Sequence, residues 1–210
     1  EADIAAARQA GNARLAAAAI EQLITRRPSD PALWLDLARE LSVAAPINDS
    51  DGYMLPSRVI GAGLRAYVLA PSRETEAEAL AIAAAGFAKR EIWRPALLAY
   101  KESLKLVEAA DIRQTYEAMR IEHGFRVTDY KVENDATPPR VCFELSDPVS
   151  RTVSDFSPYF RQEPGPVSAV TAEGNRLCVE GLQHGERYSI TVRKGLPAAA
   201  DDQFAKDFDF

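Results

Sequence analysis

The sequence predicts an α+β protein of two domains: helical hairpins over residues 1–123, then an antiparallel β-sandwich over residues 124–210. The first observation is a shift in composition, because residues 1–123 hold 29 of the 36 alanines but only 4 of the 13 valines. Alanine favours helices, whereas valine favours strands. The second is a change in hydrophobic spacing, from helical offsets to strict alternation. We therefore place the domain boundary near Gly124.

Apolar and small residues in the first part recur at the offsets of paired helices. Over residues 77–105 the spacing is typical of a tetratricopeptide repeat, in which small residues let two helices approach and large residues fill the space between them. The matching positions are Leu80, Ala83, Ala84 and Phe87 on a first helix, then Ala96, Tyr100 and Ser103 on a second. The same offsets recur upstream, at Ala16, Ile20 and Leu23, at Trp34, Leu37, Ala38 and Leu41, and at Val59, Gly63 and Ala66.

Two further segments complete the predicted helical domain. An insertion, Pro46–Pro56, interrupts the second helix pair. Its stretch Asn48–Gly52 lacks the first and twelfth carboxylates of a calcium loop, so we interpret it as a solvated turn. A last helix over Asp111–His123 is expected to cover the open end of the stacked core.

The second part has the spacing of short antiparallel strands. Its most specific pattern is Leu182-x-x-Gly185-x-x-Tyr188, which is typical of the tyrosine corner in fibronectin type III and immunoglobulin-like sandwiches. There the Tyr188 hydroxyl is expected to satisfy a backbone group upstream while its ring joins the core. An aromatic group, Phe156, Tyr159 and Phe160, is expected to fill the core or an edge. Alternating runs lie at Phe125–Val132, Arg140–Leu145, Val167–Ala172, Arg176–Glu180, Arg187–Arg193 and Phe204–Phe210.

Several stretches around these strands resemble the first macroglobulin-type domain of bacterial α2-macroglobulins. They are Arg140–Pro148, Arg176–Tyr188 and Gly195–Pro197, together with Glu122–Tyr130, which resembles that family's entry into the domain. The resemblance covers residues 111–210 and extends to the helical part in outline. It implies the N-terminal part of a very large periplasmic protein, exported with its leader removed, that traps proteases. In such a trap a protease cuts a bait region, is enclosed, and is captured by a buried thioester. The implied partners are proteases and a cell-wall synthase.

The chain lacks the residue patterns for that chemistry and for other catalysis. A thioester needs Cys-x-Glu-Gln, whereas Leu145 follows Cys142-Phe-Glu and Gly181 follows Cys178-Val-Glu. The two histidines, His123 and His184, stand outside hydrolase and zinc-site signatures. We therefore expect no enzyme activity, no cofactor and no metal site in this chain.

Charge and hydropathy argue against two further classes of partner. The chain has 25 basic and 31 acidic residues, a formal net charge of −6, and its basic residues are scattered singly. This distribution provides no basic patch that would bind nucleic acid. Charged residues interrupt the alanine-rich stretches well before the roughly 20 apolar residues that a membrane-spanning helix needs. We therefore expect no nucleic-acid partner and no membrane span.

Two functions from different classes remain. The chain is either the non-catalytic base of a protease trap, or a repeat adaptor whose concave face grips a peptide or protein partner in the cell envelope. The expected groove positions are mostly small and apolar and lack a Lys, Arg and Asn clamp for a peptide carboxylate, which favours the trap. Those positions are Ala32, Leu35, Arg39, Ser42, Glu78, Ala81, Ala85 and Ala88.

The two cysteines, Cys142 and Cys178, are predicted to form a disulfide. Each lies in an alternating strand opposite the core residues, which places both thiols on the solvent side of the sheet. In a fibronectin-like order these are the second and fifth strands, antiparallel neighbours that bring opposed cysteines within bonding range. The oxidising periplasm that the resemblance implies would close the bridge. The alternative interpretation is two ordinary buried cysteines.

Overall fold

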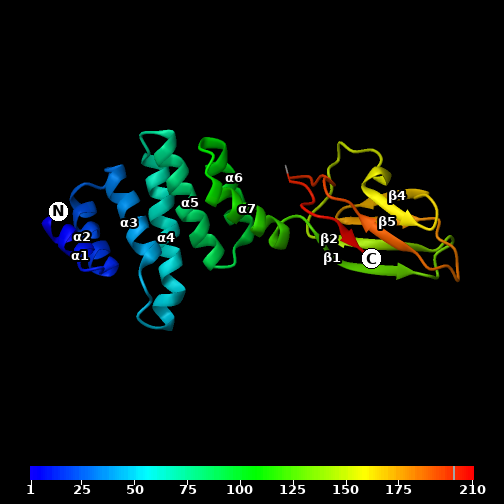
Figure 1. Ribbon diagram of the computed structural model, residues 1–210, viewed down its shortest axis with the longest axis horizontal. Coiled ribbons are helices and arrows are strands. Elements are labelled where there is room, and N and C mark those ends of the chain that lie inside the picture. The colour runs from blue at the N-terminus through cyan, green and yellow to red at the C-terminus, as the bar shows by residue number, and fades with distance from the viewer. Residues whose placement is uncertain (201) are drawn as a thin grey trace. The chain divides into compact units, whose positions relative to one another are not determined.

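The computed structural model describes residues 1–200 and 202–210, which fold as two compact units, Glu1–Tyr116 and Glu117–Phe210. Helices form the first unit and antiparallel sheets dominate the second (Figure 1), which confirms the predicted order of a helical part followed by a β part. The last helix contributes residues to both units, and the boundary predicted near Gly124 lies just after its end.

The helical unit is a row of helices in which sequence neighbours from the first helix to the sixth pack side by side (Figure 1). Helix α3 also packs against α5. Most of the positions predicted to pack are buried, while Leu23, Trp34 and Phe87 are half-buried. The helices are α1 (Ala2–Gln9), α2 (Ala13–Arg26), α3 (Pro31–Val43), α4 (Asp49–Leu69), α5 (Arg73–Lys89), α6 (Trp93–Leu106) and α7 (Ala110–His123).

Helix α4 begins earlier than the sequence predicts. The segment Pro46–Pro56 is expected to be an insertion, yet α4 starts at Asp49 and contains Pro56. The Asn48 side chain caps the helix by accepting a hydrogen bond from the Asp51 backbone nitrogen at 2.9 Å. Arg14 of α2 binds the Asp51 carboxylate. The interpretation as a solvated turn is therefore wrong for most of this segment, because a cap and a distant arginine hold its first turns helical.

The β unit contains two antiparallel sheets that share one core. The first sheet has the strand order β1-β2-β5-β4, and the second has β3-β6-β7. The Phe143 side chain of β2 is fully buried, and its ring centroid lies 5.9 Å from that of Phe160 in β3. Alternate residues of both sheets thus build the core. The strands are β1 (Val127–Glu133), β2 (Arg140–Leu145), β3 (Phe160–Glu163), β4 (Ala169–Glu173), β5 (Arg176–Glu180), β6 (Ser189–Val192) and β7 (Phe208–Asp209).

Strand boundaries agree with expectation in the middle of the first sheet and depart from it elsewhere. Strands β2 and β5 coincide with the predicted runs. Phe156 and Phe160 are buried in the core, which confirms their expected packing, but Phe160 also begins β3, a strand that the alternation did not predict. The run Phe204–Phe210 shortens to β7, because the Phe204 backbone nitrogen donates instead to the Leu196 carbonyl at 2.9 Å.

Candidate functional site

The turn that precedes β6 has the geometry of a tyrosine corner. The Tyr188 hydroxyl accepts a hydrogen bond from the Gln183 backbone nitrogen at 3.1 Å, and the Tyr188 ring packs against the core. Leu182 is buried in the same core. Gly185 has a φ of 81°, a left-handed conformation that glycine adopts without steric cost. These residues shape the entry into β6, while His184 beside them is exposed.

Removing the hydroxyl in the variant Tyr188→Phe is expected to lower the free energy of unfolding by about 0.5–1.5 kcal/mol, the usual net contribution of one hydrogen bond. Urea denaturation followed by circular dichroism measures this change. The matched control is Tyr130→Phe, because the Tyr130 hydroxyl makes no hydrogen bond within residues 1–200 and 202–210. An equal effect of the two variants would contradict the role of the corner.

Strands β2 and β5 bring Cys142 and Cys178 directly opposite each other. The two residues are paired in the antiparallel register, with 3.9 Å between their Cα atoms, and their sulfur atoms form a disulfide. The bridge links positions that are 36 residues apart in the chain. It joins the two central strands of the first sheet.

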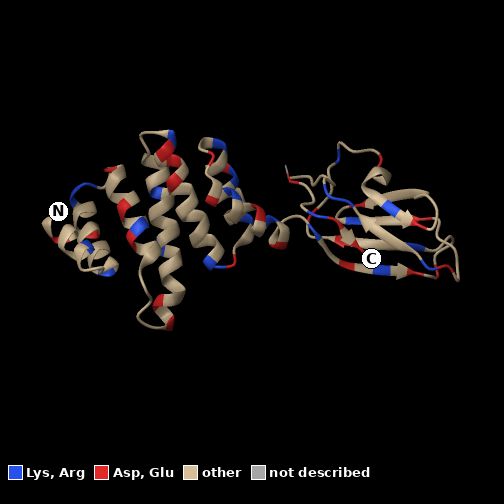
Figure 2. Ribbon diagram, viewed as in Figure 1, with Lys and Arg blue, Asp and Glu red and all other residues tan. Residues whose placement is uncertain are grey.

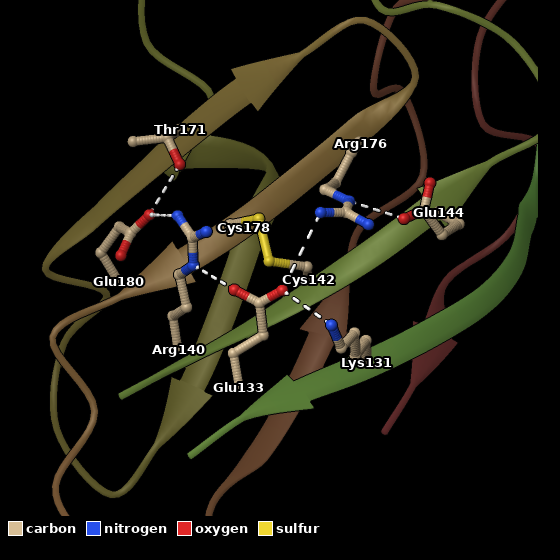
Figure 3. Close-up of a disulfide and its surroundings, with 9 residues drawn as sticks. All are labelled: Lys131, Glu133, Arg140, Cys142, Glu144, Thr171, Arg176, Cys178 and Glu180. Atoms are coloured by element: carbon tan, nitrogen blue, oxygen red, sulfur yellow. Dashed lines mark hydrogen bonds and ion pairs between the residues drawn. A yellow bond between two sulfur atoms is a disulfide. The ribbon is translucent and has the colours of Figure 1, made fainter. Parts of the chain in front are cut away.

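Both strands carry the same pattern, Arg-x-Cys-x-Glu, centred on their cysteines. Because the strands are antiparallel, the arginine of each faces the glutamate of the other. Arg176 Nε lies 2.6 Å from Glu144 Oε1, and Arg140 Nη1 lies 3.2 Å from Glu180 Oε1 (Figure 3). The sequence analysis missed these two pairs, although the repeated spacing is a signal from which complementary cross-strand ion pairs could have been predicted.

Side chains from the neighbouring strands β1 and β4 join these two ion pairs and form a charged cluster that covers the disulfide. Glu133 of β1 binds Arg140 Nε at 2.7 Å, and its other carboxylate oxygen lies 3.4 Å from Lys131 Nζ (Figure 3). Thr171 of β4 donates its hydroxyl to Glu180 at 2.8 Å. The expectation that both thiols lie on the solvent side is therefore corrected. They occupy the face opposite the apolar core, but the charged side chains leave Cys142 0% and Cys178 2% exposed.

The ion pairs also affect titration at this cluster. The hydrogen bond from Arg140, assisted by Lys131, holds the pKa of Glu133 below its ordinary value of 4.5. The same hydrogen bond and a second one to Glu180 raise the pKa of Arg140. A carboxylate with a lowered pKa stabilises the folded state above its unfolded-state pKa, and that contribution is lost as the pH falls through the folded-state pKa.

The variant Glu133→Gln is accordingly expected to be less stable than the wild type at pH 7, with a difference that shrinks as the pH falls below 4.5. Thermal melts between pH 7 and pH 3 measure the difference. Glu186→Gln is the control, because the exposed Glu186 side chain forms no ion pair with any described residue. A gap between Glu133→Gln and wild type that stays constant down to pH 3 would contradict the assignment.

The first helices of the predicted pairs are joined by a chain of ion pairs. Arg8 of α1 lies 2.6 Å from Glu40 and 3.2 Å from Asp36, both in α3. Asp36 also lies 3.0 Å from Arg39, which binds Glu78 of α5 through two hydrogen bonds of 2.6 Å. Hydrogen bonding to Glu78 raises the pKa of Arg39. Of the expected groove positions, Leu35 is buried rather than open to a ligand.

The two histidines considered for catalysis or metal binding lie in different elements. His123 ends α7, where its Nε2 lies 3.6 Å from Glu122, whereas His184 lies in the turn before β6. Within residues 1–200 and 202–210, His, Cys, Asp and Glu side chains form no group of three or more that could hold a metal ion. The described helices include none that is long and apolar enough to cross a membrane.

A scan against protein-family models and a search of curated proteins find no match to this chain.

Proposed function

We propose that this chain is the non-catalytic N-terminal part of a bacterial α2-macroglobulin-like periplasmic protease inhibitor, with a tetratricopeptide-like helical part and a macroglobulin-type β-sandwich. The observation that carries the proposal is where the resemblance falls. Arg140–Pro148 and Arg176–Tyr188 contain the paired Arg-x-Cys-x-Glu strands, the bridge between them and the tyrosine corner. The residues that resemble the family thus build the central strands of the first sheet.

A structural role within the inhibitor is supported by the state of the possible nucleophiles. Both cysteine sulfur atoms are bonded to each other and covered by ion pairs, so neither can form a thioester or attack a protease. His123 and His184 lie in different elements, His123 at the end of α7 and His184 in the turn before β6. The chemistry of capture is therefore assigned to another part of the protein.

The alternative, an adaptor that grips a peptide, is less well supported by the helical face. Arg39 is the strongest candidate there for binding a carboxylate, and it already holds Glu78 in a two-bond ion pair. Lys89 of α5 donates to the Ser42 carbonyl at 3.2 Å. A peptide carboxylate would have to displace an existing partner at each of these positions.

The proposal is tested with the complete natural protein from which this chain derives. After incubation with a broad-specificity serine protease, hydrolysis of a large protein substrate is expected to fall while hydrolysis of a small peptide substrate continues, because an enclosed protease excludes large molecules. The 210-residue chain alone is the control and is expected to alter neither rate and to form no covalent adduct. Equal hydrolysis of both substrates with and without the complete protein would overturn the proposal, as would a protease crosslinked to Cys142 or Cys178.

A further inference from the structure

Helix α4 carries an exposed apolar face along most of its length. Its exposed hydrophobic side chains include Val68, Tyr53 and Met54, which are 69%, 63% and 51% exposed. They lie on the side of the helix opposite its buried residues, at the three- and four-residue spacing of one helical stripe. We call this surface the α4 face, and it consists of Tyr53, Met54, Ser57, Gly61, Leu64, Tyr67 and Val68.

No residue of the α4 face is itself charged, although the guanidinium of Arg90, which follows α5, lies against Tyr53 and Ser57. Between Tyr53 and the end of α4 the charged residues are Arg58 and Arg65, which both lie along one edge of the stripe. Most of the α4 ribbon is accordingly tan in Figure 2, the colour of residues other than Lys, Arg, Asp and Glu. Arg58 lies 2.7 Å from Glu21 of α2, so its charge is already paired. Such a surface resembles an interface core, from which charged residues are depleted, more than an ordinary solvated helix.

Gly61, at the centre of the α4 face, is not explained by packing within the chain. A Cβ built on it would meet nothing within 4 Å among the described residues, and its φ is not left-handed. By contrast, a Cβ on Gly63 would lie 3.0 Å from the Ala79 carbonyl oxygen of α5. Glycine inside a helix costs roughly 0.5–1 kcal/mol relative to alanine. Gly61 therefore lowers the stability of α4 with no gain in contacts among the described residues, which points to close approach by a helix from outside.

One end of the α4 face is held in place before any partner binds. The guanidinium of Arg90 lies 4.1 Å from the centre of the Tyr53 ring and donates to the Tyr53 hydroxyl at 2.8 Å. Arg90 also binds the Ser57 hydroxyl. A fixed aromatic side chain loses little conformational entropy on association, which suits it to anchor an interface.

We propose that the α4 face is a self-association surface, through which two copies of this chain pair with their α4 helices antiparallel and crossing at Gly61. A two-fold axis at that point places the large Leu64 of each copy beside the small Ser57 of the other. It also places Val68 beside Tyr53. The contact is thus complementary to itself, as a two-fold interface must be.

The size of the surface agrees with a weak dimer. The five large side chains of the α4 face are 38–69% exposed, which together amounts to an exposed area on the order of 500 Å². Two copies would then bury about 1,000 Å², near the lower limit for a specific interface. We expect a dissociation constant on the order of 10–100 µM.

Sedimentation equilibrium over a concentration series from about 5 to 500 µM tests the proposal on the 210-residue chain. The average mass is expected to rise from 23.0 kDa toward twice that value. Gly61→Leu is expected to weaken association at least tenfold without unfolding α4, because its Cβ has free space and leucine is a better helix former. Val68→Glu is expected to weaken it similarly, because it places a charge in the contact.

Leu98→Glu is the matched control, since Leu98 is 60% exposed on α6, outside the α4 face. Its dissociation constant is expected to equal that of the wild type. A wild-type mass of 23.0 kDa at every concentration would overturn the proposal and leave the α4 face to a different partner. Unchanged association of Gly61→Leu, or equal weakening by Leu98→Glu, would also overturn it.

Crosslinking gives a second measurement, which detects the dimer directly and does not depend on a variant that weakens association. No free cysteine is present in the part of the chain that the structure describes, so a cysteine introduced there is its single thiol. Gly61→Cys is expected to form a disulfide-linked dimer on mild oxidation, because the two-fold axis brings the two positions together. Leu98→Cys is expected to remain largely monomeric. Equal crosslinking of the two variants would contradict the proposed crossing point.

Discussion

The double variant Cys142→Ala/Cys178→Ala is expected to lose roughly 3–4 kcal/mol of unfolding free energy in the β unit. The bridge closes a loop of 36 residues, and in the chain-entropy model such a crosslink destabilises the unfolded chain by about that amount. Urea denaturation monitored through the nuclear magnetic resonance signals of β2 and β5 residues would follow the β unit. The urea concentration at the midpoint of unfolding is expected to fall. The slope of the unfolding free energy against urea concentration is expected to rise, because a chain without the crosslink exposes more surface when it unfolds.

Reduction of the wild type supplies the matched comparison. Reduced wild-type protein is expected to unfold close to the double variant, since both lack the crosslink while the strands keep their arginine and glutamate pairs. A titration of thiols in the denatured, unreduced protein provides an independent check and is expected to find none. Two titratable thiols, or a double variant as stable as the oxidised wild type, would contradict the bridge.

The variant Phe143→Ala is expected to lose about 3–5 kcal/mol of unfolding free energy, the largest effect of any single substitution considered for the β unit. The Phe143 side chain is completely buried between the two sheets. Its ring centroid lies 5.8–6.2 Å from those of Phe160, Phe208 and Phe210. Truncation removes these contacts and leaves a cavity that close-packed neighbours can fill only in part. Urea denaturation measures the loss.

Val132→Ala is the control for this substitution, because Val132 lies in the same sheet but is 45% exposed. It is expected to change the unfolding free energy by less than about 0.5 kcal/mol, as exposed positions usually do. Limited proteolysis offers a second readout, in which Phe143→Ala speeds cleavage of the β unit and Val132→Ala does not. Similar losses from the two substitutions would mean that the two sheets do not share a packed core.

Much of the central architecture follows from local patterns. Alternation defined the strands Arg140–Leu145 and Arg176–Glu180 to the residue, because each has one face in the core and one outside it. The shift from alanine to valine separated helices from strands because the two residues have different intrinsic preferences for helix and strand. The functional assignment, in contrast, depends on a resemblance that these patterns do not test, so it stays a proposal with its own experiment.

Departures from the predicted structure occur where partners distant in the sequence decide the outcome. The start of α4 depends on Arg14, which reaches Asp51 from another helix. Strand β3 exists because its backbone pairs with β6, about thirty residues later in the chain. No periodicity within either segment reports such a contact, because the hydrogen bonds and charges that favour it come from elsewhere in the fold.

The sequence by itself determined the succession of helices and strands and the tyrosine corner, since each depends on spacing within a short segment. The opposition of the two cysteines, 36 residues apart, required in addition the strand order of a fibronectin-like fold. Only the tertiary structure decided that the disulfide is covered, because Glu133 comes from a third strand to join Arg140 over it. It also separated Gly63, which packs against α5, from Gly61, which meets open space. The two glycines are alike in sequence, and their difference arises from which side of α4 the neighbouring helix covers.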